Sequence, residues 1–333
     1  MTQTQSAAPV GERTTQERRS DGHRGRLVGA LPFLVLVALV AVITVQQPTF
    51  LSVPNVRGLL ESMTPILLLS IGQTFVILTG GIDLSFAVTS SFATVLLALW
   101  IPDLGGLAVA AVLVVTALIG LVNGLVIAKA QIPSFIATLG ALGLYSGLGL
   151  AISGASTIRI SAGYEAIGWI TDLRMAQLPL AAVLVIGLAI AVSLGMRALA
   201  HGRDLHATGL AEQALLMSGG STVTLRVIAF TLCSLFAGLA AVVLAASQHS
   251  GGPTLADTLQ LPAIAAVVIG GTAITGGVGG AIKTTVGALI IVVLRVGLSV
   301  VGVDPSYEQI VYGVVIIAAV VLTIDRSRLQ VVK

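Results

Sequence analysis

The chain has 333 residues, of which 56% are hydrophobic and only 9% carry a charged side chain. A soluble domain carries about 25% charged residues, so this composition excludes an ordinary soluble enzyme or binding domain. The formal net charge is +3, and the first 26 residues hold five Arg against Glu12, Glu17 and Asp21, so the basic balance lies largely in a tail and does not imply nucleic-acid binding.

Long apolar stretches then fill the chain in order. A helix of about 20 residues spans the hydrocarbon core of a bilayer, where only helices or closed barrels satisfy every backbone N–H and C=O group. The stretches are too long for barrel strands and do not alternate. We therefore predict an all-α, polytopic transmembrane helical bundle of about ten spans. They lie at Leu27–Val45, 56–79, 84–101, 105–128, 133–153, 178–198, 224–246, 259–275, 283–301 and 308–324.

The ends and connections are polar. Residues 1–26 are Arg-rich and non-periodic, which predicts a disordered cytoplasmic tail before a transmembrane domain at 27–325, and 326–333 form a second cytoplasmic tail. With the N-terminus inside, 13 Lys and Arg face the cytoplasm and three (Arg57, Arg159 and Arg174) face outside, which predicts that both termini are cytoplasmic. The outer connections carry acids that are either docking charges or solvated loop residues: Asp103, Glu165, Asp172, Asp257 and Asp304.

The inner connection at 199–223 is the most polar long segment after the N-terminal tail. Within it, residues 211–217 predict a short helix, entered from Thr208-Gly209 and ended by Ser218-Gly219-Gly220. We expect Leu215, Leu216 and Met217 to be exposed on this helix. They need either a partner protein to cover them or contact with the membrane interface.

A weak internal repeat joins the two halves. VILTGGIDLS at 76–85 and VVIGGTAIT at 267–275 each place a Gly pair after an apolar run. Paired Gly-interrupted segments in corresponding halves are typical of a transport pathway.

Polar residues inside spans are costly in lipid and tend to face a cavity or another helix. Asp83 either caps the following helix or takes part in gating and solute passage. Asn123 is either interhelical glue beside Gly120 and Gly124 or a pore-lining group. Arg295 either faces a cavity or forms an ion pair. The residues predicted for the translocation pathway or its gate are Gln73, Thr79, Asp83, Ser85, Asn123 and Arg295.

Catalytic and metal motifs are absent from the sequence, which predicts a transport protein that is no enzyme and binds no cofactor itself. The Gly-rich run at 276–284 places Ile282 where a phosphate-binding loop needs Gly before Lys283. Cys233 is alone, and His23, His201, His206 and His249 show no ligand spacing. A proton-relay pump needs chains of intramembrane acids, and few acids lie within the spans.

Several long segments resemble one known family. The runs at 72–85 (GQTFVILTGGIDLS), 123–154 (NGLVIAKAQIPSFIATLGALGLYSGLGLAISG), 261–280 (LPAIAAVVIGGTAITGGVGG) and 287–303 (GALIIVVLRVGLSVVGV) are similar, in order, to the sugar-type permeases of bacterial ATP-binding-cassette importers, the ribose/xylose/arabinose branch. The inner segment at 202–220 (GRDLHATGLAEQALLMSGG) resembles the cytoplasmic coupling segment of that family.

The resemblance implies a multi-pass permease of the bacterial inner membrane that carries a monosaccharide or related polyol. Its implied partners are an ATPase subunit that holds ATP and Mg, an external solute-binding protein and a second permease chain. The residues implied to couple to the ATPase are Gly202, Arg203, Gly209, Glu212, Ser218 and Gly219. Leu210-Ala211 and Met217 depart from the family pattern and suggest a dedicated ATPase, and Arg295 stands where relatives often carry Asn.

Two functional hypotheses therefore follow. The first is the permease subunit of an ATP-driven, binding-protein-dependent importer. The alternative is a gradient-driven secondary transporter or channel for a small polar solute. Uptake by the chain alone under a proton or sodium gradient would discriminate the alternative from the first hypothesis.

Overall fold

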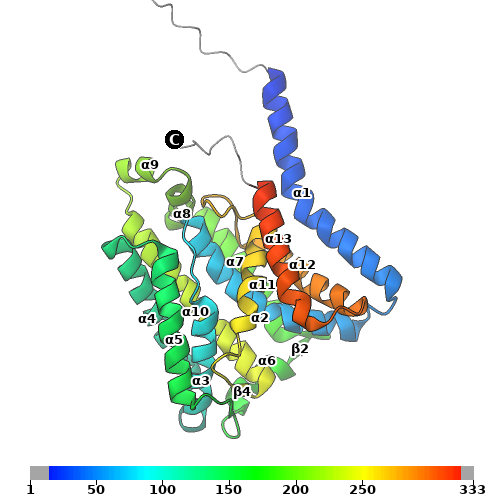
Figure 1. Cartoon of the computed structure of the whole chain (residues 1–333), viewed down its shortest axis with the longest axis vertical. Coiled ribbons are helices and arrows are strands. Elements are labelled where there is room, and N and C mark those ends of the chain that lie inside the picture. Colours follow the sequence, from blue (N-terminus) through cyan, green and yellow to red (C-terminus); the bar gives the residue numbers. More distant parts are fainter. Residues whose placement is uncertain (1–14, 324–333) are drawn as a thin grey trace, which may run out of the picture.

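The computed structural model describes residues 15–323, which form a bundle of helices with very little sheet (Figure 1). Within this described part, seven helices are long and apolar enough to cross a membrane, which confirms an all-α polytopic fold. These helices are α2 (Val53–Leu78), α3 (Phe86–Leu104), α4 (Leu107–Ala130), α5 (Ser134–Ser153), α7 (Leu180–Ala198), α10 (Thr222–Gln248) and α12 (Ala281–Val300).

Three further helices are apolar over a shorter length. They are α1 (Thr15–Gln46), α11 (Gln260–Ile269) and α13 (Glu308–Thr323). The total of ten spans and the internal repeat therefore stay predictions. α1 begins at Thr15, ahead of the predicted start at Leu27. The rest of the predicted N-terminal tail and the tail at 326–333 lie outside the described residues.

Small elements gather at the two ends of the bundle (Figure 1). At one end lie α6 (Glu165–Asp172) and the strand pairs β1 (Ile158–Arg159) with β4 (Ser250–Gly251) and β2 (Arg174–Met175) with β3 (Leu178–Pro179), both antiparallel. Two 3-10 turns, η1 (Asp257–Leu259) and η2 (Pro305–Tyr307), precede α11 and α13. At the other end lie α8 (Ala200–Leu210) and α9 (Glu212–Met217), together with the C-terminal end of α13.

α2 forms the centre of the bundle and is buried continuously from Met63 to Leu78. Hydroxyl groups tie it to the C-terminal helices: Ser70 Oγ donates to the carbonyl oxygen of Ala263 on α11 at 3.1 Å, and Thr74 Oγ1 lies 2.8 Å from Thr284 Oγ1 on α12. Such hydrogen bonds between helices satisfy hydroxyls that lipid could not hydrate. They fix α2 against α11 and α12.

Glycines let helix backbones touch. At Gly120 of α4, a Cβ would lie 2.3 Å from the carbonyl oxygen of Phe230 on α10, and at Gly124 one would lie 2.8 Å from the Cα of Val227. The pair therefore places α4 directly on α10, because close backbone approach needs small residues. The side chain of Asn123, between these two glycines in the sequence, instead contacts Ser85.

The chain between β4 and α11 is irregular, with turns and the 3-10 turn η1, and α3 supplies hydrogen bonds to it. The N–H of Gly252 donates to Thr94 Oγ1 at 3.1 Å, and the N–H of Ala256 donates to Ser91 Oγ at 2.8 Å. Ser91 Oγ in turn donates to Asp257 Oδ1 at 2.7 Å. Irregular backbone inside a membrane protein is tolerated where protein groups satisfy it in this way.

The predicted span at 259–275 ends early, at Ile269. Gly270 and Gly271 end the helix, and Gly271 has φ of +90°, a left-handed conformation that glycine adopts without a steric penalty. The chain then turns through residues 272–280 to reach α12.

Candidate functional site

The inner connection at 199–223 folds into two helices. The predicted helix at 211–217 is confirmed as α9, but α8 is an additional helix that the sequence did not predict. Gly202 permits the sharp turn from α7 into α8, because a Cβ there would lie 2.3 Å from the carbonyl oxygen of Met196. Gly209, expected before a helix, instead lies in the last turn of α8.

Gly209 packs against two parts of the chain that come from its opposite halves: the end of α2 and the connection before α12. A Cβ on Gly209 would lie 2.2 Å from the amide nitrogen of Gly277 and 2.4 Å from the carbonyl oxygen of Leu78. Those two groups are themselves joined, since the N–H of Gly277 donates to the Leu78 oxygen at 2.9 Å. Any side chain larger than hydrogen at Gly209 would push the connections apart.

We call this contact the glycine junction, made of Leu78, Gly80, Gly209, Gly276 and Gly277. A Cβ on Gly276 would lie 2.8 Å from the amide nitrogen of Gly80 and 3.0 Å from the Cα of Gly209, so all three chain segments meet through their backbones. The junction connects α8 to the end of α2 and to the connection that precedes α12.

A side chain reinforces the junction. His206 Nδ1 on α8 lies 3.0 Å from the carbonyl oxygen of Gly277. A carbonyl oxygen only accepts hydrogen bonds, so Nδ1 must carry the proton in this contact. His206 and Gly209, on the same face of α8, therefore hold the same connection.

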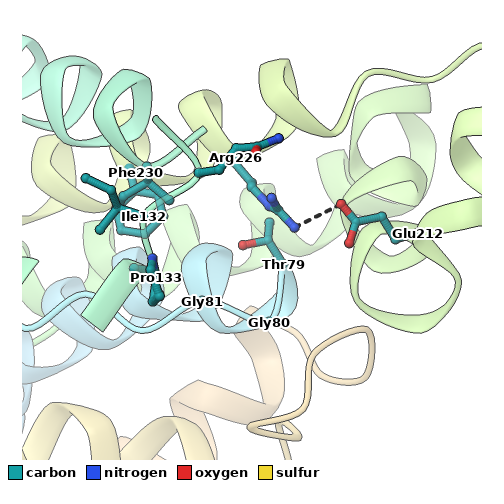
Figure 2. A pocket seen from close by; sticks show the side chains of 11 residues that line it. Thr79, Gly80, Gly81, Ile132, Pro133, Glu212, Arg226 and Phe230 are labelled. Carbon is teal, nitrogen blue, oxygen red and sulfur yellow. Dashed lines mark hydrogen bonds and ion pairs between the residues drawn. The ribbon is translucent and has the colours of Figure 1, made fainter. Parts of the chain in front are cut away.

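The predicted coupling residue Glu212, at the start of α9, forms an ion pair with Arg226 of α10 at 2.9 Å. Both side chains line a pocket of ≈370 Å³ between α9, α10 and the connections that follow α2 and α4 (Figure 2). The predicted pathway residue Thr79 also lines this pocket, beside Gly80 and Gly81. The pocket therefore borders the glycine junction.

The remaining predicted coupling residues lie on α8 and at the end of α9. Arg203 is exposed, Ser218 Oγ donates to the carbonyl oxygen of Leu215 at 2.8 Å, and Gly219 ends α9 with φ of +84°. Leu215 is buried against Gly220, so the expectation that it is exposed was wrong. Leu216 and Met217 are exposed as expected, Met217 at 90%.

A buried polar cluster brings together four of the predicted pathway residues. Asp83 is fully buried, and its Oδ1 accepts hydrogen bonds from the N–H and the hydroxyl of Ser85, both at 2.7 Å. Asn123 Nδ2 donates to Ser85 Oγ at 3.2 Å. Gln73 Oε1 accepts from the thiol of Cys233 at 3.6 Å. Asp83 thus shapes the turn that leads into α3, whose N-cap residue is Ser85. Capping by Asp83 and a role in gating both stay predictions.

This cluster is not fully satisfied. Among the described residues, Gln73 Nε2 and Asp83 Oδ2 are buried side-chain atoms with no hydrogen-bond partner, as are the hydroxyls of Thr89, Ser90 and Ser234. Buried polar atoms are normally paired, and exceptions commonly mark bound water, strain or function. These unpaired polar atoms lie on α2, α3 and α10 and in the connection that enters α3.

Arg295 lies elsewhere. Its Nε is 3.2 Å from Glu308 Oε2, which links α12 to the start of α13. The Arg295 side chain is 48% exposed and the Glu308 side chain 16% exposed. Of the two alternatives for Arg295, the structure contains the ion pair, and Arg295 is not part of the buried polar cluster.

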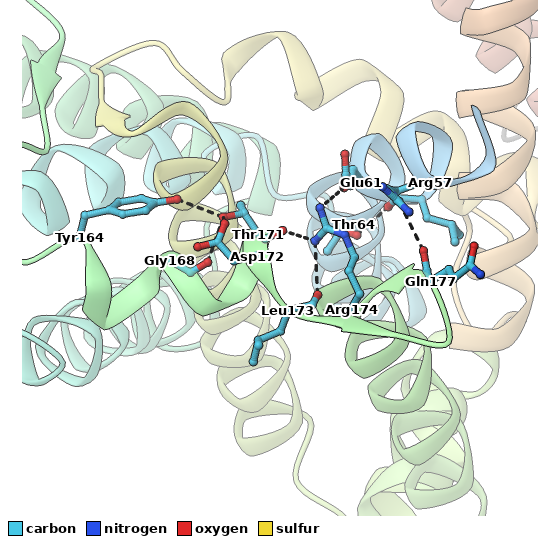
Figure 3. Close-up of polar contacts among 11 residues, drawn as sticks. Arg57, Glu61, Thr64, Tyr164, Gly168, Thr171, Asp172, Leu173, Arg174 and Gln177 are labelled. Atoms are coloured by element: carbon cyan, nitrogen blue, oxygen red, sulfur yellow. Dashed lines mark hydrogen bonds and ion pairs between the residues drawn. The ribbon is translucent and has the colours of Figure 1, made fainter. Parts of the chain in front are cut away.

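At the opposite end, polar contacts hold the β2–β3 hairpin against α2 (Figure 3). Arg174 forms an ion pair with Glu61 at 3.3 Å, and Arg57 Nε donates to the carbonyl oxygen of Gln177 at 3.4 Å. Tyr164, the residue before α6, donates its hydroxyl to the carbonyl oxygen of Ala246 at 3.0 Å. These contacts fix the hairpin and α6 to the bundle.

Four of the five predicted outer acids are exposed and one is not. Asp103, Glu165, Asp172 and Asp304 are exposed, whereas Asp257 is partly buried by its bond to Ser91. Hydrogen bonds from the side chain and N–H of Ser306 hold the pKa of Asp304 below its usual range, so this carboxylate keeps its charge at neutral pH.

The structure reveals contacts that the sequence did not predict. Arg226 pairs with the coupling residue Glu212, Gly277 packs against the coupling residue Gly209, and His206 bonds to Gly277. In the sequence, His206 had no ligand spacing and Gly277 was only part of a Gly-rich turn. The polar side chain of His206 on the inner connection was the one feature of the sequence that pointed to these contacts. No group of three or more His, Cys, Asp or Glu that could hold a metal occurs within residues 15–323.

Comparisons with known proteins assign the chain to a transport family. The family described as "Branched-chain amino acid transport system / permease component" matches residues 55–320. The ribose import permease protein RbsC of Escherichia coli (strain K12) is 34% identical over 298 residues, covering 87% of this chain and 91% of the relative. RbsC of Bacillus subtilis (strain 168) is also 34% identical, over 309 residues, covering 89% and 92%.

A galactose-type relative is more distant. The galactose/methyl galactoside import permease protein MglC of Escherichia coli (strain K12) is 29% identical over 315 residues, covering 87% of this chain and 92% of the relative. No solved structure matches the chain.

Proposed function

The chain belongs to the permease-component family just described, and from that premise we propose how it works and what it carries. It is a permease subunit of an ATP-binding-cassette sugar importer of the ribose and galactose type, and thus a transport component rather than an enzyme. The names of its relatives favour this reading over a gradient-driven transporter or channel. Its proposed cargo is a monosaccharide or related polyol.

The glycine junction is the observation that carries the proposed mechanism. An external force on α8 reaches the end of α2 and the connection before α12 through backbone contacts at Gly209. A contact without flexible side chains transmits displacement with little loss, because packed backbones do not compress. Closure of a partner ATPase against α8 and α9 would therefore move both halves of the bundle together.

The proposal includes ten membrane segments and a cytoplasmic side for both termini. The seven long helices together with α1, α11 and α13 make ten membrane-embedded segments, two related halves being joined at the Gly turns. α8 and α9 face the cytoplasm of a bacterium, and both termini lie on that side of the inner membrane. The excess of Lys and Arg in the inner connections supports this orientation.

The proposed partners contact opposite ends of the chain. An ATPase subunit, which holds ATP and Mg, covers the exposed Leu216 and Met217 of α9. A solute-binding protein docks on the outer end, where Glu165, Asp172 and Asp304 are exposed. A second permease chain forms the pathway with this one. The chain itself binds no cofactor in this proposal.

The buried polar cluster is the proposed gate. Gln73, Asp83, Ser85 and Asn123 are shut away from solvent, so a solute reaches them only when α3 moves relative to α2 and α10. Thr79 links this gate to the pocket beside the glycine junction. Arg295, in its ion pair, has a supporting role on α12.

A double substitution tests the coupling role. Glu212→Lys with Gly219→Trp removes the ion pair to Arg226 and adds bulk where α9 ends. In the reconstituted importer, we expect solute-stimulated ATP hydrolysis to be lost while membrane insertion is kept. Gly187→Trp is the control for bulk, because nothing lies within 4 Å of a Cβ at that position. Normal uptake by the double variant would reject the coupling role.

A further inference from the structure

The pocket beside the glycine junction has the size and lining of a small-molecule site. Its volume of ≈370 Å³ is at the small end of the range of about 300–1,000 Å³ that ligand pockets occupy. Four segments converge on it: the connection after α2, the connection after α4, the start of α9 and the first turns of α10 (Figure 2). A ligand there would touch all four segments at once.

The charges in the pocket cancel. Glu212 and Arg226 are paired across it at 2.9 Å, and they are the charged side chains among the described residues that line it. An anion would have to compete with Glu212 for the guanidinium group of Arg226, and a cation would meet Arg226. The electrostatics therefore favour a neutral ligand.

The uncharged groups in the lining offer both donors and acceptors. Thr79 Oγ1 gives its proton to the carbonyl oxygen of Val76, which leaves oxygen lone pairs to accept. Ser134 Oγ accepts from the N–H of Ile82, which leaves its own proton to donate. The exposed amide of Gln131 can do both. Hydroxyl groups, which also donate and accept, match this mixture.

An apolar surface completes the lining. Phe230, Pro133 and Ile127 supply it next to the polar groups. The carbon-bound hydrogens of a sugar ring present an apolar face that packs on such surfaces, while its hydroxyls point to the polar side. The lining as a whole suits a compact molecule with one polar and one apolar side.

We propose that this pocket binds the transported neutral sugar from the cytoplasmic side and thereby slows the transport cycle. The inference rests on the proposed function for the cargo class and for the side of the membrane. A sugar that bridges Gln131 and Ser134 to the pair of Glu212 and Arg226 ties α9 to the connection after α4. That tie opposes the movement of α8 and α9, so accumulated product inhibits further import.

The test uses proteoliposomes that hold the complete importer with its ATPase facing the bath. Sugar-loaded binding protein is sealed in the lumen, and D-ribose, D-galactose or D-ribose 5-phosphate is added to the bath. We expect the neutral transported sugar to lower ATP hydrolysis about twofold at millimolar concentration, the affinity of a weak site. The phosphate ester should have no effect at the same concentration.

Two variants locate the effect, with each rate normalised to that of the same variant without bath sugar. Gln131→Ala should raise the concentration needed for inhibition about fivefold, the loss expected for one hydrogen bond. Gln46→Ala, an exposed glutamine at the end of α1, should not change it. Inhibition that is equal in Gln131→Ala and in the unsubstituted protein would overturn the proposal.

Failure of the inference and failure of the proposed function are distinguishable. If lumenal sugar stimulates ATP hydrolysis and bath sugar does not inhibit it, the pocket proposal is wrong and the importer assignment stands. If lumenal sugar fails to stimulate, the cargo assignment is wrong. Calorimetric titration of D-ribose and D-galactose into the purified complex then tests whether the pocket binds sugar. If neither sugar binds, the pocket proposal is overturned.

Discussion

The N–H of Gly277 donates to the carbonyl oxygen of Leu78 at 2.9 Å, which joins the connection before α12 to the last residue of α2. These residues are far apart in the sequence: Leu78 precedes the first Gly-rich turn and Gly277 belongs to the second. Gly209 of α8 lies against both partners of this hydrogen bond. The inner connection therefore contacts the bundle where its two halves are already joined.

The first prediction concerns Gly209→Ala. The added methyl group would lie 2.2 Å from the Gly277 nitrogen and 2.4 Å from the Leu78 oxygen, so α8 must move outward. Overpacking of this kind costs about 1–3 kcal/mol, and we expect sugar-stimulated ATP hydrolysis by the complete importer to fall about tenfold. Gly187→Ala, with open space around its Cβ, is the matched control. Full activity of Gly209→Ala would show that the junction tolerates separation.

The second prediction separates two roles of Asp83. Asp83→Asn keeps an oxygen that accepts from the N–H and hydroxyl of Ser85, whereas Asp83→Ala removes it. We expect Asp83→Ala to lower the free energy of unfolding by about 1–3 kcal/mol, and Asp83→Asn by much less. Thermal unfolding in detergent and uptake are measured on the same preparations. If Asp83→Asn unfolds normally but stops uptake, the negative charge itself serves transport.

The third prediction concerns the pair of Arg295 and Glu308. Arg295→Met leaves the mostly buried carboxylate of Glu308 without its positively charged partner, and we expect it to destabilise the protein by about 1–2 kcal/mol. The double variant Arg295→Met with Glu308→Gln should recover most of that loss. We also expect the double variant to retain uptake, because Arg295 lies outside the buried polar cluster. Loss of uptake in a stable double variant would place Arg295 in the pathway.

The fourth prediction tests orientation. Cys233 is the only cysteine and is buried, so a cysteine introduced elsewhere reacts alone with a membrane-impermeant maleimide. Met217→Cys on α9 should be labelled only from the cytoplasmic side, and Met175→Cys on the β2–β3 hairpin only from outside. Both residues are exposed. Labelling of the two positions from one side would contradict the proposed topology.

The long helices could be predicted because lipid imposes one rule on them. A segment such as 133–153 is apolar, long enough to cross and bounded by polar residues, and it becomes α5 at Ser134–Ser153. The same rule overextended the span at 259–275. Its residues after Ile269 are apolar enough for lipid, but Gly270 and Gly271 turn the chain aside to meet α8.

The candidate site was harder to predict, because its contacts join residues that are distant in the sequence. The polar residues near Asp83 were visible as exceptions in apolar spans, and the structure brings four of them together. α8 was missed because its polar residues showed no clear helical signal and Gly209 suggested a helix start. Only the approach of Leu78 and Gly277 explains why a glycine lies inside that helix.

The two irregular stretches on either side of α11 have a mechanical consequence. This helix has only ten residues, with the chain that Ser91 and Thr94 hold at one end and the Gly270-Gly271 turn at the other. Because the chain on both sides of α11 is irregular, this helix can tilt as a unit without any continuous helix being broken. A Cβ on Gly287 would lie 1.9 Å from the carbonyl oxygen of Ala266, so α12 must follow any such rocking.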